Sequence, residues 1–111
     1  MLSGGYTKKL VDINERSFLV QILNYDNGNF VSVTEGSQNI GGMIVSINSG
    51  PVPSTSTIIP PKSEALFLKL VSEKIAYVRQ GMCFVTGNFE KALEKETTKQ
   101  LMDIILEESK Q

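Results

Sequence analysis

Apolar and polar residues alternate along the first half of the chain, with the period of two that places successive side chains on opposite faces of a β-strand. The segments with this pattern are residues 9–13, 17–25, 30–34 and 40–48. Within the third of them, Phe30, Ser32 and Thr34 fall on one face, and Val31 and Val33 fall on the other. The first half of the chain therefore predicts four strands.

Short polar segments separate these strands and predict the turns between them. Residues 14–16 are short enough for a hairpin. Residues 26–29, with the sequence DNGN, give the stronger signal, because Asn and Gly tolerate the positive φ of tight turns. The pair Gly41 and Gly42 opens the fourth strand, and it predicts a β-bulge or a close backbone approach.

All four prolines fall in residues 49–61, so the backbone there cannot form an uninterrupted ladder. We expect most of this segment to be loop, with a brief edge strand at residues 55–59. Loops of this length tend to be functional or disordered, and the alternative is a simple crossing from the sheet edge to the next helix. The predicted partner-binding residues are Pro51, Val52, Pro53, Ser54, Thr55, Ser56, Thr57, Ile58 and Ile59.

From residue 62 to residue 80 the apolar residues recur every three or four positions, which is typical of an amphipathic helix. The periodic residues are Leu66, Phe67, Leu70, Val71, Ile75 and Val78. Ser63 is the predicted N-cap, and Glu64 lies in the first turn, where its charge suits the helix dipole. Gly81 is expected to end the helix in a left-handed conformation.

The remaining sequence predicts one strand and one more helix. Residues 82–86 form a short apolar run between glycines, which favours a buried strand. A second amphipathic helix is expected within residues 90–108. Its start is open, because Asn88 could cap a long helix, while Thr97 or Thr98 could begin a shorter one.

This order of elements predicts an α+β fold, with a mainly antiparallel sheet of about six strands packed by two helices in the order βββββαβα. The length of 111 residues fits one domain that covers residues 1–111. A chain of this size can bury a cooperative core without disulfides. Cys83 is the only cysteine, so no intramolecular disulfide is expected.

The residues that usually carry chemistry are scarce. The chain has no histidine, which removes the commonest general base and metal ligand. Cys83 lies in an apolar strand, where a thiol is expected to fill the core. The carboxylates of the last third are interleaved with lysines, as on a solvated helix face, and they are Glu90, Glu94, Glu96, Asp103, Glu107 and Glu108. We expect no catalytic residues, no metal site and no cofactor.

The large apolar side chains are assigned to the core. They are Met43, Met82, Met102, Phe18, Tyr25, Phe30, Phe67, Tyr77, Phe84 and Phe89. An aromatic platform for nucleic-acid bases would need a positive groove beside it, and none is indicated by the charges.

The charge balance and the hydropathy pattern limit which kinds of binding partner and which cellular location are expected. Eleven basic and twelve acidic residues leave a net charge of −1, without the basic footprint that nucleic acid requires. No apolar run reaches the roughly 18 residues of a membrane span, and the first ten residues lack the apolar core of a secretory signal. We therefore expect no nucleic-acid or membrane partner and a cytoplasmic or nuclear location.

Six segments follow one another in an order and spacing that resemble those of a known family. They are KKLVDINERSFLVQILNY, FVSVTEGSQNIGGMIVSI, SGPVPSTSTIIPP, SEALFLKLVSEKIAYV, MCFVTG and TKQLMDIILEE. Together they resemble the proteasome assembly chaperone 3 family, with its opening hairpin, its next strand pair, its Ser/Pro loop and its two helices. The segment GNFEKALEKE departs from the family because it is longer than the family's passage into the last helix.

The resemblance implies a non-enzymatic protein without a cofactor that assists assembly of the α-subunit ring of the 20S proteasome. It also implies dimers, with a proteasome assembly chaperone 4-like protein as the partner and with a second copy when the chain is purified alone. A profilin-like or longin-like binding module is the alternative, since it also combines a small sheet with helices. Shortening residues 51–59 is expected to weaken partner binding and to leave the fold intact.

Overall fold

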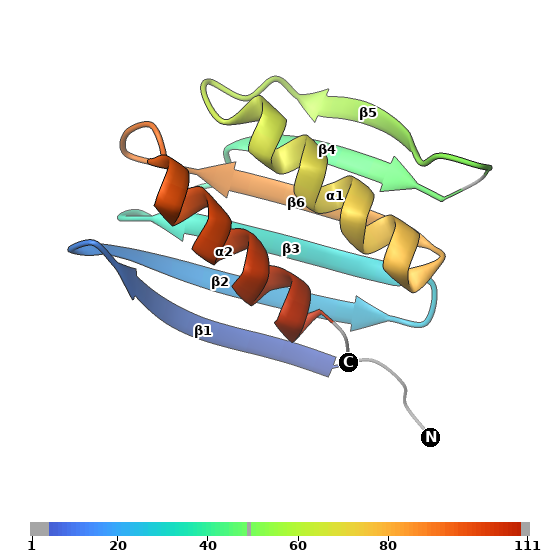
Figure 1. Cartoon of the computed structure of the whole chain (residues 1–111), viewed down its shortest axis with the longest axis horizontal. Helices are drawn as coiled ribbons and strands as arrows, with labels where there is room; N and C mark the ends of the chain where they lie inside the picture. Colours follow the sequence, from blue (N-terminus) through green and yellow to red (C-terminus); the bar gives the residue numbers. More distant parts are fainter. Residues whose placement is uncertain (1–4, 49, 110–111) are drawn as a thin grey trace.

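The computed structural model describes residues 5–48 and 50–109. The elements are β1 (Gly5–Ile13), β2 (Arg16–Tyr25), β3 (Gly28–Glu35), β4 (Gly42–Ile47), β5 (Ser54–Ile59), α1 (Ala65–Arg79), β6 (Met82–Asn88) and α2 (Lys95–Glu108). The six strands form one sheet in the order β1-β2-β3-β6-β4-β5 (Figure 1). β3 and β6 are parallel, and every other neighbouring pair is antiparallel. The predicted fold class and element order are confirmed.

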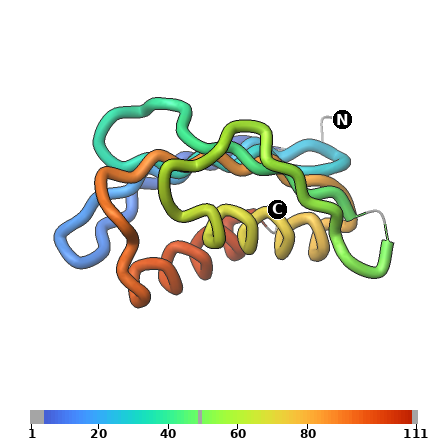
Figure 2. The backbone as a smooth tube through the Cα atoms, turned by 90° about the horizontal axis from the view of Figure 1, so that it is seen from above, coloured from blue at the N-terminus to red at the C-terminus, as the bar shows by residue number. Residues whose placement is uncertain are grey.

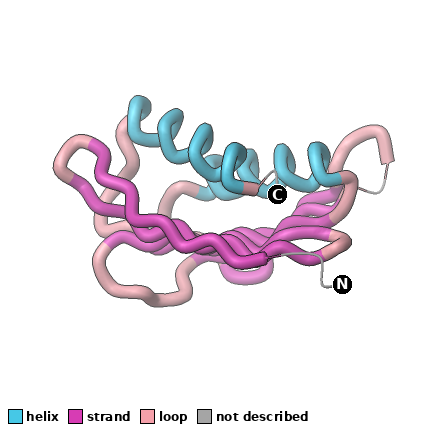
Figure 3. The backbone as a smooth tube through the Cα atoms, turned by 90° about the horizontal axis from the view of Figure 1, so that it is seen from below, coloured by secondary structure: helices cyan, strands magenta, loops and turns pink. Residues whose placement is uncertain are grey.

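Both helices lie on one face of the sheet, and within residues 5–48 and 50–109 no helix covers the opposite face (Figures 2 and 3). Alternate side chains of the central strands point toward the helices, where burial of a large aliphatic side chain contributes about 1.5–3 kcal/mol. The buried apolar residues are Val11, Ile13, Phe18, Val20, Ile22, Val31, Val33, Ile44, Phe67, Leu68, Val71, Ile75, Ala76, Cys83, Val85, Leu101 and Ile105. The helix-covered face is therefore the core of the protein.

Both predicted hairpins are present, but their turns differ from the expected chemistry. Asn14 and Glu15 join β1 to β2 with φ values of 51° and 65°, which is the pattern of a two-residue turn between strands. The turn between β2 and β3 contains no positive φ at Asp26 or Asn27. Gly28 is needed there for another reason, because a Cβ atom would lie 2.1 Å from the carbonyl oxygen of Met82.

β6 lies between β3 and β4 in the sheet. The family resemblance makes β3 and β4 a strand pair, but the last strand of the chain separates them. β5 and β6 both run antiparallel to β4, and α1 therefore crosses from the edge of the sheet back to its centre. The glycine pair permits this insertion, because a Cβ on Gly41 would lie 2.0 Å from the carbonyl oxygen of Gly87. The predicted close approach at the glycine pair is confirmed.

The ends of α1 differ from the predicted caps. The N-cap is Glu64, not Ser63, and it has a left-handed backbone with φ 62° and no side-chain capping bond. Its carboxylate instead accepts a hydrogen bond from the backbone N–H of Leu93 at 2.9 Å, and tertiary contact thus replaces the local cap. At the other end the left-handed residue is Gln80, not Gly81.

Gly81 is constrained by a contact with the β2–β3 turn, and replacing it by Ala is expected to destabilise the protein. A Cβ at this position would lie 2.3 Å from the carbonyl oxygen of Asn27. The backbone must shift, which is expected to cost about 1–3 kcal/mol of unfolding free energy in a urea titration. Gly50→Ala is the matched control, since nothing lies within 4 Å of a Cβ there. Equal stability of the two variants would contradict this packing argument.

The last strand and helix also differ from their predicted bounds. β6 extends to Asn88, two residues beyond the predicted end, so Asn88 does not cap a helix. α2 begins at Lys95 after the N-cap Glu94, between the two starts that the sequence left open. The intervening segment lies against the β1–β2 turn.

A buried ion pair fastens that segment to the sheet. Arg16 donates two hydrogen bonds to the carboxylate of Glu35, at 2.8 and 2.7 Å, and each side chain is only 5% exposed. Arg16 also donates to the carbonyl oxygens of Lys91 and Ala92, and Glu35 accepts from the N–H of Glu90. The Arg16 guanidinium holds the pKa of Glu35 below its ordinary value, against the opposing effect of burial.

Candidate protein-binding surfaces

The groups best suited to catalysis or metal binding are the carboxylates and the single thiol, Cys83. Among the described residues no three His, Cys, Asp or Glu side chains are placed to hold a metal ion. Cys83 is fully buried, and burial raises the pKa of its thiol to about 12, so the reactive thiolate is absent near neutral pH. The predicted assignment of Cys83 to the core is confirmed.

A chain of side-chain hydrogen bonds joins α1 to the edge of the sheet. Ser46 Oγ lies 2.7 Å from Ser72 Oγ and 2.9 Å from Thr55 Oγ1. Thr55 donates to Glu73 at 2.6 Å, and Ser72 donates to the carbonyl oxygen of Lys69. Ser46 and Ser72 are fully buried, so their hydroxyls connect elements of the fold.

The uncovered face of the sheet carries a row of apolar side chains that crosses five of the six strands. Strand register places the members of this row side by side. They are Tyr6, Leu23, Phe30, Phe84 and Val45. The rings of Phe30 and Phe84 stack, with centroids 6.1 Å apart and an angle of 19° between their planes. These contacts order the row within one chain.

A second set of apolar residues extends this row toward one end of the strands. Tyr25, Met82 and Ile47 lie on the same face, one pleat away from Leu23, Phe84 and Val45. We call these eight residues the open sheet face; each of them is half-buried or exposed. Contiguous apolar surface on a soluble protein marks a site of contact with another molecule, and sheets are usually covered where both faces are apolar.

The open sheet face was missed in the sequence because its aromatic residues and methionines were assigned to the core. That assignment is wrong for Tyr25, Phe30, Phe84 and Met82, which lie on the side of the sheet away from the helices. A signal was present in FLVQIL of β2, which is apolar at both alternating sets of positions. Such a run indicates a strand that is covered on both faces, and two helices cover only one.

The predicted contact segment, residues 51–59, is mostly strand. Six of the nine predicted residues form β5, the edge strand that pairs only with β4, and Pro51 to Pro53 precede it. The brief edge strand expected at residues 55–59 is confirmed, and it begins one residue earlier, because pairing with β4 satisfies the backbone of residues 54–59. Ser49 lies outside the described residues. Val52 and Ile58 are 72% and 49% exposed.

A third apolar surface lies on the helix side, next to this segment. A groove of about 300 Å³ has an apolar lining of Pro53, Leu70, Tyr77, Val78 and Leu106, and Glu73 and Lys74 also border it. α1 is thus apolar on two sides, since Phe67, Val71 and Ile75 face the core. The periodic residues Leu66, Leu70 and Val78, which the sequence grouped with the core stripe, are exposed.

No helix among the described residues is long and apolar enough to cross a membrane.

Comparison with known proteins identifies the fold. No family model matches the sequence, and no curated protein matches it. The chain is similar to a chain in the crystal structure of a novel chaperone complex for yeast 20S proteasome assembly, with a TM-score of 0.60 and 13% sequence identity. The similarity covers 99% of this chain and 91% of the other. The fold of this protein therefore resembles that of a chain in this complex over nearly its full length.

Proposed function

We propose that this chain is a non-enzymatic chaperone of the cytoplasm, which assists assembly of the 20S proteasome α-ring by binding α-subunits as a dimer with a chaperone-4-like protein. The open sheet face is the main support for the proposal. This face of the sheet has a central apolar row and no described helix over it, and such a face is typical of a surface that a partner covers. The fold similarity over nearly the full length of both chains supports the proteasome role.

The shape of the open sheet face favours another sheet as its cover. Two sheets pack face to face at about 10 Å, with their inner side chains interdigitated. The apolar row runs across Leu23, Phe30, Phe84 and Val45 at the centre of the face, where such packing is deepest. A chain of the same fold would supply a matching sheet, so a second copy can replace the natural partner when the protein is purified alone.

Co-purification tests the proposal directly. Affinity-tagged protein is captured from an extract of its own cells, and the bound proteins are identified by mass spectrometry. We expect proteasome α-subunits together with a second small chain of the same fold. Recovery of actin or of vesicle-coat components in their place would contradict the proposal and favour a profilin-like or longin-like binding module.

The segment 51–59 remains the proposed contact with α-subunits, but shortening it is no longer a suitable test. Deleting residues 54–59 would remove β5 and expose the edge of β4, so the fold would not stay intact. Substitution of exposed side chains avoids this problem. Val52 and Ile58 are the suitable positions, since both are exposed.

The double variant Val52→Ser, Ile58→Ser is expected to bind α-subunits about tenfold more weakly, as is typical when apolar contact residues are truncated. Its unfolding midpoint in urea should stay close to that of the parent, because both side chains are solvent-exposed. Leu66→Ser, at a 68% exposed position on α1, is the matched control. Unchanged capture of α-subunits by the double variant would remove this segment from the contact.

A further inference from the structure

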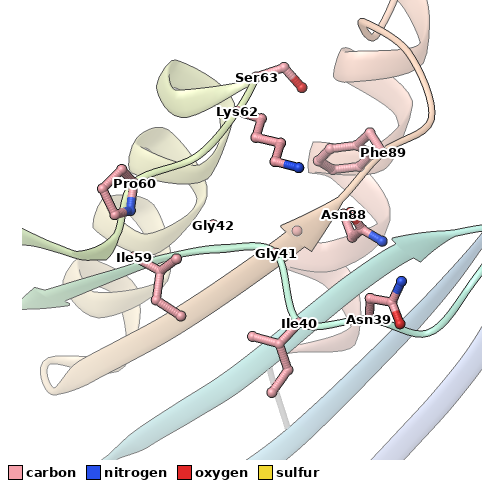
Figure 4. Close-up of a pocket in the computed structure, with 11 residues that line it drawn as sticks. Asn39, Ile40, Gly41, Gly42, Ile59, Pro60, Lys62, Ser63, Asn88 and Phe89 are labelled. Atoms are coloured by element: carbon pink, nitrogen blue, oxygen red, sulfur yellow. The ribbon is translucent and has the colours of Figure 1, made fainter.

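A cavity of about 290 Å³ opens where the loop after β3, the connector after β5 and the end of β6 meet (Figure 4). Its apolar wall includes Ile40, Ile59 and Phe89. Gly87 forms part of its base, and a Cβ there would lie 2.8 Å from the Phe89 ring. The lack of a side chain thus lets the Phe89 ring lie against the strand.

Polar side chains with free hydrogen-bonding capacity line this cavity. Lys62 is the one charged residue among its described lining residues, and it extends its ammonium toward Phe89 and the end of β6 (Figure 4). The ammonium forms no ion pair within the part of the chain that the structure describes. The side-chain amides of Asn39 and Asn88 also line the cavity, and neither bonds to another described residue. One positive charge and two amide donors are therefore available to a ligand.

The donors match a ligand with a single negative charge. A carboxylate accepts hydrogen bonds from an ammonium and from amide N–H groups at the same time. Recognition of phosphate typically uses clustered arginines or several backbone N–H groups, whereas this site has one lysine. The volume holds one or two side chains, and Ile40 and Ile59 offer apolar contact to the carbon atoms beside the carboxylate.

The cavity lies at the border of the uncovered face. The loop of residues 36–41 rises from the sheet on the side opposite the helices, and Asn39, Ile40 and Gly41 belong to it (Figure 2). The loop side of the cavity therefore lies on the same side of the sheet as the open sheet face.

We infer that the Lys62 cavity binds a carboxylate of the protein that covers the open sheet face, either an acidic side chain or a chain terminus. This inference rests on the proposed function for the origin of the carboxylate. Lys62 supplies the charge, Asn39 and Asn88 donate hydrogen bonds, and Phe89 with Ile59 contacts the apolar part of the ligand.

Titration of ¹⁵N-labelled protein with small probes tests the site by NMR. The probes are N-acetyl-leucine, with a terminal carboxylate, N-acetyl-leucyl-glutamyl amide, with a side-chain carboxylate, and the neutral N-acetyl-leucinamide. We expect saturable shifts of the side-chain amides of Asn39 and Asn88 with at least one carboxylate probe and none with the neutral probe. The carboxylate probe that binds more tightly identifies the source of the ligand group.

Lys62→Gln is expected to weaken binding of the carboxylate probe about tenfold, since the ligand then loses its charge-assisted bond. Lys69→Gln is the matched control, because Lys69 is an exposed lysine of α1 outside the cavity. Equal binding by Lys62→Gln and the parent, equal binding of the neutral probe, or no saturable shift would overturn the inference. The titration is repeated on Leu23→Glu, whose open sheet face is disrupted, so it reports on the cavity even if the sheet-pairing proposal fails.

Discussion

Replacing Arg16 by Met is expected to lower the free energy of unfolding by about 3–5 kcal/mol, because the change leaves a buried carboxylate without its partner. Glu35 is 5% exposed and receives both of its side-chain charge-assisted bonds from Arg16. The carbonyl oxygens of Lys91 and Ala92 also lose their donor. Urea unfolding at neutral pH measures the loss, which is a large share of the 5–15 kcal/mol typical of a domain.

A second substitution separates the charge from the packing. Arg16→Met, Glu35→Leu removes both charges, and it is expected to recover most of the lost stability, since an apolar pair of similar volume avoids the desolvation penalty. The loss of unfolding free energy that remains is due to the missing hydrogen bonds. These are the bond from the N–H of Glu90 to Glu35 and the bonds from Arg16 to the carbonyl oxygens of Lys91 and Ala92. A double variant no more stable than Arg16→Met would show that the buried charge is not the cause.

Acid should remove the effect of the ion pair. Arg16 holds the pKa of Glu35 below its ordinary value in the folded protein, so the pair stabilises the fold above the ordinary glutamate pKa, and this contribution fades as pH falls through the lowered pKa. The difference between the parent and Arg16→Met is therefore expected to shrink in acid. A difference that stayed constant between neutral pH and about pH 3 would contradict the linkage argument.

Replacing Leu23 by Glu is expected to raise the dissociation constant of the dimer by about 30-fold or more, whether the partner is a second copy or the related chain. Leu23 lies between Tyr6 and Phe30 in the central apolar row of the open sheet face. A carboxylate there would be desolvated against the partner without a counter-charge. Sedimentation velocity at several concentrations measures the change.

The folded chain should tolerate this substitution, because Leu23 is 40% exposed when no partner is present. Leu66→Glu places the same charge on the helix side, at a position that is 68% exposed, and is expected to leave the dissociation constant unchanged. If Leu66→Glu dissociates the pair and Leu23→Glu does not, the dimer forms through the helices, and the proposed use of the open sheet face is wrong.

The open sheet face lies apart from the segment 51–59 and from the groove on the helix side, so these surfaces could contact different molecules. The open sheet face lies opposite the helices, so a chain paired through it keeps its helix side and the outer edge of β5 free. The segment of Val52 and Ile58 adjoins that free side, next to the groove lined by Pro53 and Tyr77. This separation would allow dimer formation and α-subunit binding at the same time.

Local sequence signals predicted most elements because strands and hairpins depend on neighbouring residues. Alternation in FVSVT placed Val31 and Val33 on the same face, and both are buried in the core. Signals at the helix ends were less informative, since tertiary contacts replaced local caps. The carboxylate of Glu64 accepts a hydrogen bond from the backbone N–H of Leu93, which lies 29 positions later in the chain. Gln80 takes the left-handed conformation that was expected of Gly81. The edge strand expected at residues 55–59 is present, and pairing with β4 extends it to residue 54.

The sequence by itself determined the element order and the α+β class, because periodicity and turn residues act over a few positions. Only the tertiary structure decided which apolar face is covered. Phe30 and Val31 are equally apolar in the sequence, and their difference arises because both helices pack on the side of Val31. The insertion of β6 between β3 and β4, which brings Phe84 beside Phe30, depends on contacts distant along the chain. The surface proposed to bind a partner is a product of that insertion.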